Sequence, residues 1–458
     1  MVDVNREYWN MEIEPRLNTE EIKSLQLEKL KSALAWQYEN TPINRKRFDK
    51  AGVKPADIDS FEAFKQAIAP IGQPEVREVI AEVGLDMQKL MLELFGEKRV
   101  NDLYLLTTTS GTTGIPTPYP NFRKSIEDGQ EIMARAAWRM GIRPGDRIGL
   151  CFGLSMHAAG TPQVLWYHKF PGITMIPIGA EAGTEKILQF MKLFGVNVFT
   201  GTPSLALHLI ERSPEVLNEP VKGLGIKTMI LGAEPGAGIP EVREKLETEY
   251  GARVFDAGAG YGCSCDHPIY QGMHWLADDY AYYELVNPET KESVPLEHGA
   301  TGMMVGTSLN PEAAVWFDMR FTLGDIHQVF TEPCPCGKTG FRYKVVGRAD
   351  DMLKVKGVPV YPAAIEGVIH SMPRELTGQF RVVLTEKPPR VVPPLKLKVE
   401  HSAEISRDDL PAVERQLLDK MHALLKIRPE IQWLEPNTLE RETKKTQLLE
   451  KHYEDLNP

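Results

Sequence analysis

Residues 104–116 read YLLTTTSGTTGIP and place six serine and threonine hydroxyls around two glycines. Glycine lets backbone N–H groups approach a polyphosphate closely, and hydroxyls donate hydrogen bonds to its oxygens. The spacing differs from that of a Walker loop, which needs G-x-x-x-x-G-K-[ST]. The stretch therefore predicts a phosphate-binding loop of another kind, with a polar turn after a strand as the alternative.

The sequence around this loop alternates buried strands with helices. Apolar runs bounded by glycine and proline (DRIGLCFGL, VNVFTGTP, IKTMILGAEP, ARVFDAGAG) are separated by helical stretches such as TEKILQFMKLFG and IPEVREKLETEYG. This alternation is typical of a mostly parallel sheet. After GRADDMLKVKG the pattern changes to two strand-like runs and one helix, which predicts a small α+β region. We therefore expect an α/β protein with a large N-terminal domain, residues 1–347, and a small C-terminal α+β domain, residues 348–458.

Composition excludes several classes of protein. The chain has 458 residues, 42% of them hydrophobic and 25% charged, as in an ordinary globular protein. With 53 Lys+Arg against 63 Asp+Glu, the net charge is −10, which argues against a nucleic-acid partner. No apolar run approaches the ~20 residues that span a bilayer, and charges occupy the first residues where a signal peptide is apolar. We expect a cytoplasmic protein without a membrane partner.

Four of the five cysteines form two C-x-C pairs, Cys263/Cys265 and Cys334/Cys336. In a reducing compartment, paired cysteines indicate a metal site before a disulfide. Cys265, His274, Cys334 and Cys336 make a Cys₃His set, which is typical of a closed structural zinc site. Cys263 or His267 are alternative ligands, and free thiols on turns are the alternative to a metal.

The SGTTGIP stretch resembles the phosphate loop of the adenylate-forming superfamily, which includes acyl-CoA ligases. Further similar segments follow in the family's order, and TPINRKRFDKAGVKPADI resembles phenylacetate-CoA ligases in particular. These segments are GAEP (232–235), TLGD (322–325), GRADDMLK (347–354) followed by Gly357, Pro362 and Glu366, and LERETKKTQLL (439–449). The resemblance covers nearly the whole chain.

The resemblance implies a two-step reaction that consumes ATP and CoA. A carboxylate first joins AMP and releases pyrophosphate, and the acyl group then passes to the CoA thiol. Lys445 would bridge the α-phosphate and the carboxylate, with Lys444 as a fallback. Asp325 and Arg348 would contact the ribose. Asp350 would be the hinge between the domains, and Gly357 would lie beside CoA. The remaining ATP- or AMP-binding residues would be Ser110, Gly111, Thr112, Thr113, Gly114, Gly232, Ala233, Glu234, Pro235, Asp256, Tyr261 and Ser264.

One segment departs from the family pattern. The family has Tyr-Gly-x-Thr/Ser-Glu, in which the aromatic ring stacks on adenine and the glutamate holds Mg²⁺. Here Tyr261, Gly262 and Ser264 fit, but Cys265 stands in the glutamate position. The other register replaces Tyr-Gly by Ala257-Gly258 and puts Tyr261 there instead. Neither register supplies a carboxylate, so Mg²⁺ would depend on the ATP phosphates and water.

The segment CFGLSMHAAG (151–160) resembles the loop that lines the acyl pocket. Phe152 would give an apolar wall, and His157 is a polar group that could meet the substrate. An arylacetate or aromatic acid is the family default, and a small hydroxylated aliphatic acid is the alternative. Two other functions stay open: an enzyme that loads a carrier-protein thiol, and a zinc-stabilised nucleotide-binding protein without ligase activity. A homodimer is plausible from the resemblance alone.

Overall fold

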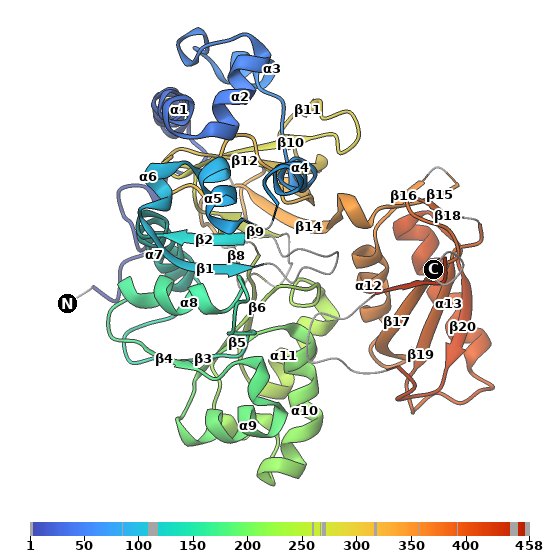
Figure 1. Ribbon diagram of the computed structural model, residues 1–458. Helices are drawn as coiled ribbons and strands as arrows, with labels where there is room; N and C mark the ends of the chain where they lie inside the picture. Colours follow the sequence, from blue (N-terminus) through green and yellow to red (C-terminus); the bar gives the residue numbers. More distant parts are fainter. Residues whose placement is uncertain are drawn as a thin grey trace. The chain divides into compact units, whose positions relative to one another are not determined.

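The computed structural model describes residues 3–84, 86–108, 118–258, 261–265, 267, 272–315, 318–356, 358–391, 393–439 and 448–453 (Figure 1). The chain divides into two compact units. The first comprises Met1–Glu181, Ala257–His267 and Gln271–Val345, and the second comprises Ala182–Asp256, Pro268–Tyr270 and Val346–Pro458. Each unit is described separately below.

Helices make up much of the N-terminal part of the first unit. The longest begins after Thr19, whose side chain accepts a hydrogen bond from the Ile22 N–H and so caps the helix. Its buried positions include Ile22, Leu30 and Leu34, which pack toward the core. The α-helices of this unit are α1 (Glu20–Asn40), α2 (Pro42–Ala51), α3 (Phe61–Ala67), α4 (Gln73–Val83), α5 (Met87–Phe95), α6 (Glu97–Val100), α7 (Arg123–Arg139) and α8 (Thr161–Trp166).

A seven-stranded sheet is the main β-structure of the first unit. Its order is β11-β10-β12-β13-β14-β9-β8. Trp275, Tyr283, Phe341 and Tyr343 pack together in one core cluster on this sheet. The strands are β8 (Gly262–Ser264), β9 (Met273–Trp275), β10 (Ala281–Val286), β11 (Ser293–Val294), β12 (Thr301–Ser308), β13 (Asp325–Phe330) and β14 (Arg342–Arg348). Two further strand pairs are the antiparallel β1 (Leu103–Thr108) and β2 (Pro118–Phe122), and the parallel β3 (Arg147–Leu150) and β4 (Thr174–Pro177).

Parallel strands alternate with helices in the first part of the second unit. Strand β6 (Thr228–Leu231) pairs in parallel with β5 (Val198–Gly201) and with β7 (Arg253–Asp256). All four residues of β5 and of β6 are buried, as expected for parallel strands covered on both faces. The helices of this part are α9 (Thr184–Leu193), α10 (Pro203–Leu217) and α11 (Pro240–Tyr250).

The C-terminal part of the second unit has two small sheets and two helices around its own core. The sheet β16-β15-β18 contains β15 (Leu353–Val355), β16 (Val358–Val360) and β18 (Arg390–Val391). The sheet β20-β19-β17-β21 contains β17 (Leu376–Leu384), β19 (Lys396–His401), β20 (Glu430–Leu434) and β21 (Leu449–Lys451). These elements share a core, which includes Ile365 and Ile369 of α12 (Pro362–His370) and Leu417 and Met421 of α13 (Leu410–Leu425).

Short 3₁₀ helices occur along the described chain. They are η1 (Glu14–Arg16), η2 (Pro55–Asp57), η3 (Tyr167–Lys169), η4 (Ala180–Ala182), η5 (Val221–Leu224) and η6 (Ala349–Asp351).

This architecture confirms the predicted fold class. Parallel strands alternate with helices, mixed and antiparallel sheets accompany them, and the C-terminal part is a small α+β structure. The predicted division into residues 1–347 and 348–458 stays a prediction. Among the described residues, no helix is both long enough and apolar enough to cross a membrane.

Candidate active site and candidate metal centre

The GAEP segment forms a turn at the carboxyl end of β6. Ala233 adopts a left-handed backbone conformation with φ of 68°, which non-glycine residues rarely adopt. The Glu234 carboxylate accepts a hydrogen bond of 2.7 Å from the Ser204 N–H, in the first turn of α10. The Gly232 N–H donates to the Gly201 carbonyl at the end of β5 over 3.1 Å. The turn is thereby fixed against the neighbouring strand end.

Asp256 lies at the same edge of the parallel strands. It is the last residue of β7, and it pairs in register with Leu231, the last residue of β6. The carboxyl ends of parallel strands are the usual place for ligands in α/β folds. The structure therefore brings together two groups of predicted residues, the GAEP turn and Asp256.

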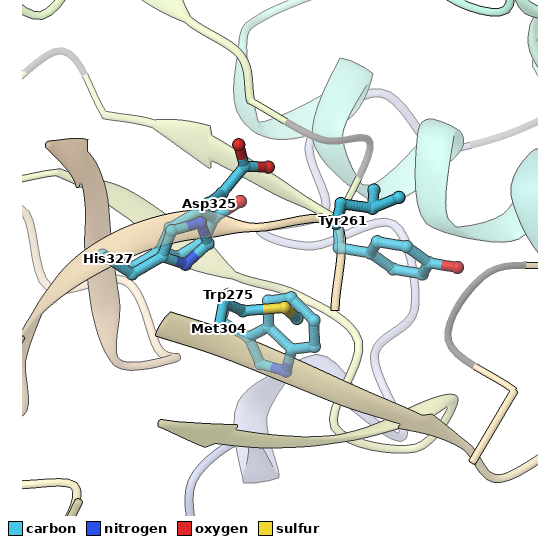
Figure 2. A pocket seen from close by; sticks show the side chains of 7 residues that line it. Tyr261, Trp275, Met304, Asp325 and His327 are labelled. Carbon is cyan, nitrogen blue, oxygen red and sulfur yellow. The ribbon is translucent and has the colours of Figure 1, made fainter. Parts of the chain in front are cut away.

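Asp325 lies in a pocket on the seven-stranded sheet of the first unit. It is the first residue of β13, directly after Gly324, whose φ is 93° and whose N–H donates to the Thr322 hydroxyl. Figure 2 shows five labelled side chains grouped around this pocket. The full lining is Tyr261, Trp275, Met304, Leu323, Asp325, His327 and Tyr343.

The predicted adenine-stacking residue, Tyr261, is a wall of this pocket. Its ring packs against Trp275 with a centroid separation of 5.5 Å. Gly262 follows it at a close approach, because a Cβ there would lie 2.6 Å from the Tyr343 hydroxyl. Ser264 is buried in β8. His327, two residues after Asp325, was not among the predicted site residues, although the same-face period of a strand could have indicated it.

The predicted acyl loop is hydrogen-bonded to β1, the strand that leads to residue 109. The Thr108 N–H donates to the Met156 carbonyl, and the Ala158 N–H donates to the Thr108 carbonyl. His157 lies in this bridge and is partly buried, as is Phe152. The loop and the approach to the phosphate loop are therefore one hydrogen-bonded structure.

A carboxylate that the sequence analysis did not single out supports the same loop. Both oxygens of Glu181 accept the Leu154 N–H, at 3.0 and 3.2 Å. A Cβ on Gly153 would lie 2.8 Å from the His157 ring and 3.2 Å from Glu181. Glycine at this position lets the histidine and the carboxylate approach the backbone.

The two predicted junction residues form an ion pair with each other. The Arg348 guanidinium lies 3.2 Å from the Asp350 carboxylate, and the Asp350 side chain is mostly exposed. Several other predicted site residues lie outside the described residues: Ser110, Gly111, Thr112, Thr113, Gly114, Gly357, Lys444 and Lys445.

The predicted Cys₃His set comes together in the first unit. The ligand atoms of Cys265, His274, Cys334 and Cys336 all lie within 4.8 Å of one another. The Sγ atoms of Cys265 and Cys334 are 3.7 Å apart, and Cys336 Sγ is 3.4 Å from His274 Nε2. We call this group the Cys/His cluster.

Hydrogen bonds fix the imidazole of the cluster in one tautomer. His274 Nδ1 lies 2.9 Å from the Thr339 carbonyl oxygen, which can only accept, so Nδ1 carries the proton. In the neutral ring, Nε2 then presents its lone pair toward the cysteines. Metal-binding histidines are commonly oriented in this way by a carbonyl.

A buried ion pair holds the turn that carries this carbonyl. Arg139 donates to the Thr339 carbonyl over 2.9 Å and to the Glu14 carboxylate over 2.7 Å. The side chains of Arg139 and Glu14 are 1% and 0% exposed. Thr339 also donates its hydroxyl hydrogen to the Glu14 carbonyl. The residues present therefore fit a tetrahedral Cys₃His metal site with an ordered surrounding shell.

The two cysteines of the first C-x-C pair differ in acidity. The hydrogen bond from Cys336, opposed by burial and aided by His274, lowers the pKa of Cys265 to about 3. Burial raises the pKa of Cys263 to about 11, so that it remains a thiol. Among the described residues, the cluster includes Cys265 and leaves out Cys263 and His267.

Comparisons with known proteins show which proteins this chain is similar to. The family model "AMP-binding enzyme C-terminal domain" matches residues 357–451. A phenylacetate-coenzyme A ligase of Thermus thermophilus is 29% identical over 418 residues, covering 87% of this chain and 86% of that protein. A phenylacetate-coenzyme A ligase of Aromatoleum evansii is 26% identical over 445 residues, covering 94% and 95%.

Solved structures give the same fold. A 2-hydroxyisobutyryl-CoA ligase in the postadenylation state, in complex with 2-HIB-AMP, has a TM-score of 0.85 at 24% identity and covers 100% of this chain and 95% of that one. The same enzyme with 2-HIB-AMP and CoA in the thioesterification state has a TM-score of 0.66 at 25% identity, with 98% and 95% covered.

The chain thus has the fold of a solved acyl-CoA ligase, and its C-terminal part matches the C-terminal domain of AMP-binding enzymes. Over most of its length, the chain is similar to phenylacetate-CoA ligases.

Proposed function

We propose that this protein is an AMP-forming acid–CoA ligase. A carboxylate oxygen of the substrate attacks the α-phosphorus of ATP, and the bond to the β-phosphate oxygen breaks to release pyrophosphate. The CoA thiolate then attacks the acyl carbonyl carbon, and AMP leaves as the C–O bond breaks. The observation that carries the proposal is the match to phenylacetate-CoA ligases over most of their length.

We assign the residues of the ATP site from the resemblance. Asp325 accepts hydrogen bonds from the ribose hydroxyls, and Arg348 supplies a cation to the same group. Glu234 and its turn, which is fixed by Ser204, line the adenylate side of the site. Ser110, Gly111, Thr112, Thr113 and Gly114 bind phosphate, as their hydroxyls and backbone N–H groups favour.

Lys445 is the proposed catalytic residue. Charge gathers on the α-phosphate and the attacking carboxylate in the transition state, and a lysine ammonium between them stabilises it. Asp350 is the proposed hinge, in a C-terminal domain that begins at residue 348, and Gly357 is the proposed place of close approach for CoA.

The acid is proposed to be an arylacetate or a related aromatic acid. Phe152 supports an apolar wall for a ring. The second candidate is a small hydroxylated aliphatic acid, because His157 is held in the acyl loop by the Thr108 bridge and could meet a hydroxyl.

We also propose that the Cys/His cluster binds Zn²⁺ as a structural ion. The ion would fasten β8, β9 and the turn at 334–339 by closing their four ligands into one site. Mg²⁺ would accompany ATP on its phosphates and water, because Cys265 occupies the position of the family's metal-binding glutamate. A cytoplasmic homodimer remains a proposal from the resemblance.

The decisive experiment measures AMP and pyrophosphate release over a panel of carboxylic acids, with and without CoA. AMP formation with an aromatic acid, increased by CoA, supports the ligase. Pyrophosphate exchange without a CoA effect would indicate a carrier-loading enzyme. No turnover across the panel, with ATP still bound, would favour the non-catalytic nucleotide-binding protein.

The same assay tests the catalytic lysine with a neighbouring pair of variants. Lys445→Ala should lower the rate of adenylate formation about 100-fold or more while ATP binding persists, since a group that stabilises transition-state charge contributes about that factor. Lys444→Ala is the matched control and should stay within about threefold of the unchanged protein. The reverse ranking would transfer the role to Lys444.

A further inference from the structure

His327 lines the Asp325 pocket, and one of its ring nitrogens has no partner among the described residues. Its side chain is only 2% exposed, and it lines the pocket together with Asp325 and Tyr261 (Figure 2). Within the described residues, Nε2 has no hydrogen-bond partner. A buried polar atom without a partner is destabilising, and in native proteins such an atom commonly meets a ligand or water.

The other ring nitrogen fixes the tautomer. His327 Nδ1 lies 2.8 Å from the hydroxyl oxygen of Tyr283, which is itself buried. If Nδ1 carried the proton, the phenol hydrogen of Tyr283 would need a second acceptor. The stable arrangement has the phenol donating to Nδ1, so that Nε2 carries the ring proton. Burial lowers the pKa of His327 to about 3, which keeps the ring neutral at physiological pH.

Stacking holds the ring in one orientation. Tyr343 lies against His327 with a centroid distance of 4.7 Å and an interplanar angle of 15°. The Tyr343 hydroxyl donates to the Gly258 carbonyl over 3.2 Å, which ties this ring to the segment before Tyr261. His327 is therefore a fixed residue of the pocket lining with a buried N–H donor.

We infer that His327 is a nucleoside-binding residue whose Nε2–H donates a hydrogen bond to an acceptor atom of the bound nucleotide. This inference rests on the proposed function, which places the ribose at Asp325. Residues 325 and 327 share one face of β13 and lie about 7 Å apart along it. The carboxylate accepts from ribose hydroxyls, and the imidazole supplies the complementary donor to a ribose oxygen or a purine ring nitrogen. Tyr283 is a positioning residue, because it acts through the histidine.

The test compares variants that separate the hydrogen bond from the packing. His327→Phe keeps the stack on Tyr343 and removes the donor, and combining it with Tyr283→Phe removes the phenol left without a partner. His327→Gln places an amide N–H close to the position of Nε2. His298, which is partly exposed and pairs with Glu332, supplies the control His298→Gln.

The readouts are the calorimetric Kd for ATP alone and the KM and kcat of AMP formation. His327→Phe should weaken ATP binding and raise its KM about tenfold, as expected for one net hydrogen bond, with a smaller change in kcat. His327→Gln should recover part of the loss, and His298→Gln should match the unchanged protein. Equal ATP affinity in His327→Phe would overturn the inference.

Nucleotide analogues identify the acceptor. The unchanged protein and His327→Phe are each titrated with ATP, 2′-deoxy-ATP, 3′-deoxy-ATP and 7-deaza-ATP. The analogue that lacks the contacted atom should bind the unchanged protein more weakly than ATP does. It should bind the His327→Phe variant as well as ATP does. The same penalties in both proteins for every analogue would contradict a contact with the nucleoside.

A measurement on the unchanged protein removes dependence on variant folding. In ¹⁵N-histidine-labelled protein, the His327 Nε2 signal should be that of a protonated nitrogen and should shift when AMP is added. Tyr283→Phe should change the ratio of the two tautomers. If AMP binds and the Nε2 signal does not move, the inference is overturned. If the protein binds ATP and AMP but forms no AMP from any acid, only the proposed function is contradicted.

Discussion

The Cys/His cluster and the Asp325 pocket lie on the same sheet of the first unit and differ in how their polar groups are satisfied. In the cluster, the ligand atoms lie beside one another, the Thr339 carbonyl bonds to the histidine, and Arg139, paired with Glu14, bonds to that carbonyl. In the pocket, Asp325 and His327 lie among aromatic side chains, and Nε2 of His327 has no partner within the described part of the chain. A closed ligand set is typical of a structural metal, and an apolar pocket with a few convergent polar groups is typical of a ligand site.

This difference indicates that two sites on one sheet can have separate roles, one in stability and one in binding. Loss of the cluster should first affect the stability of the protein, and loss of pocket groups should first affect nucleotide binding. The following changes would break or sharpen that division, starting with the largest expected effect.

Cys265→Ser should abolish stoichiometric zinc binding and lower the stability of the first unit by about 4 kcal/mol, the stabilisation from a ligand at about a thousand times its Kd. The reason is that a bound metal stabilises only the folded state. Metal content by elemental analysis and thermal unfolding with and without a chelator check this result.

Cys263→Ser is the matched control for this change. Cys263 is buried two residues earlier, and its sulfur is not part of the Cys/His cluster. Its zinc content should stay at one ion per chain. If Cys263→Ser lost the metal while Cys265→Ser kept it, the assignment of ligands would be wrong. If a chelator changed the thermal unfolding of neither protein, a structural zinc would be contradicted.

A smaller effect is expected from the ion pair behind the cluster. The double variant Arg139→Met/Glu14→Gln removes both charges together, so that neither is left buried alone. Because Arg139 holds the carbonyl that orients His274, zinc affinity should fall about tenfold. Competition with a chromophoric chelator measures this affinity.

Helix α7 offers a matched control one turn earlier. Arg135 and Asp279 form another buried ion pair, at 2.7 Å, that does not contact the cluster. Arg135→Met/Asp279→Asn should keep the zinc affinity unchanged. Equal losses in the two double variants would mean that general destabilisation, and not orientation of His274, determines metal binding.

The sequence predicted the fold through features that are local in the chain. Buried runs between glycines and prolines indicated the parallel strands, and the GAEP and TLGD segments end or begin strands as their turn residues suggest. The four cluster residues were also predictable, because cysteine and histidine spacing limits the possible ligand sets.

Residues whose roles depend on tertiary packing were not predictable in this way. Glu181 supports the acyl loop from 27 positions away, and Glu14 reaches Arg139 from 125 positions away. Neither is part of a motif. The unused nitrogen of His327 follows from its contacts with Tyr283 and Tyr343, which lie 44 and 16 residues apart from it in the sequence, on two other strands.

An effect of similar size to the loss of zinc affinity concerns a carboxylate near the pocket. Burial raises the pKa of Asp128 to about 6, although Asn310 donates a hydrogen bond of 3.0 Å to it. The negative charge of Asp128 also contributes to raising the pKa of Tyr261 in the pocket wall. Asp128 therefore takes up a proton on folding in mildly acidic solution.

The sign of its pH dependence is opposite to that of the cluster. Because the folded-state pKa of Asp128 exceeds the unfolded value of about 3.9, its stabilising contribution is complete below pH 4 and is lost as the pH rises through 6. Metal binding changes the other way, since cysteine and histidine release protons to bind zinc. Asp128→Asn should stabilise the protein by roughly 1–2 kcal/mol at pH 8 and by almost nothing at pH 4.

Thermal unfolding from pH 4 to pH 8, with zinc saturating, measures this difference against Glu127→Gln on the adjacent, exposed position of α7. The control should follow the unchanged protein at every pH. A gain in Asp128→Asn that is equal at both ends of the range would mean that Asp128 is charged throughout. In that case Asp128 would not titrate in this pH range, and the pocket would not differ from the cluster in its pH dependence.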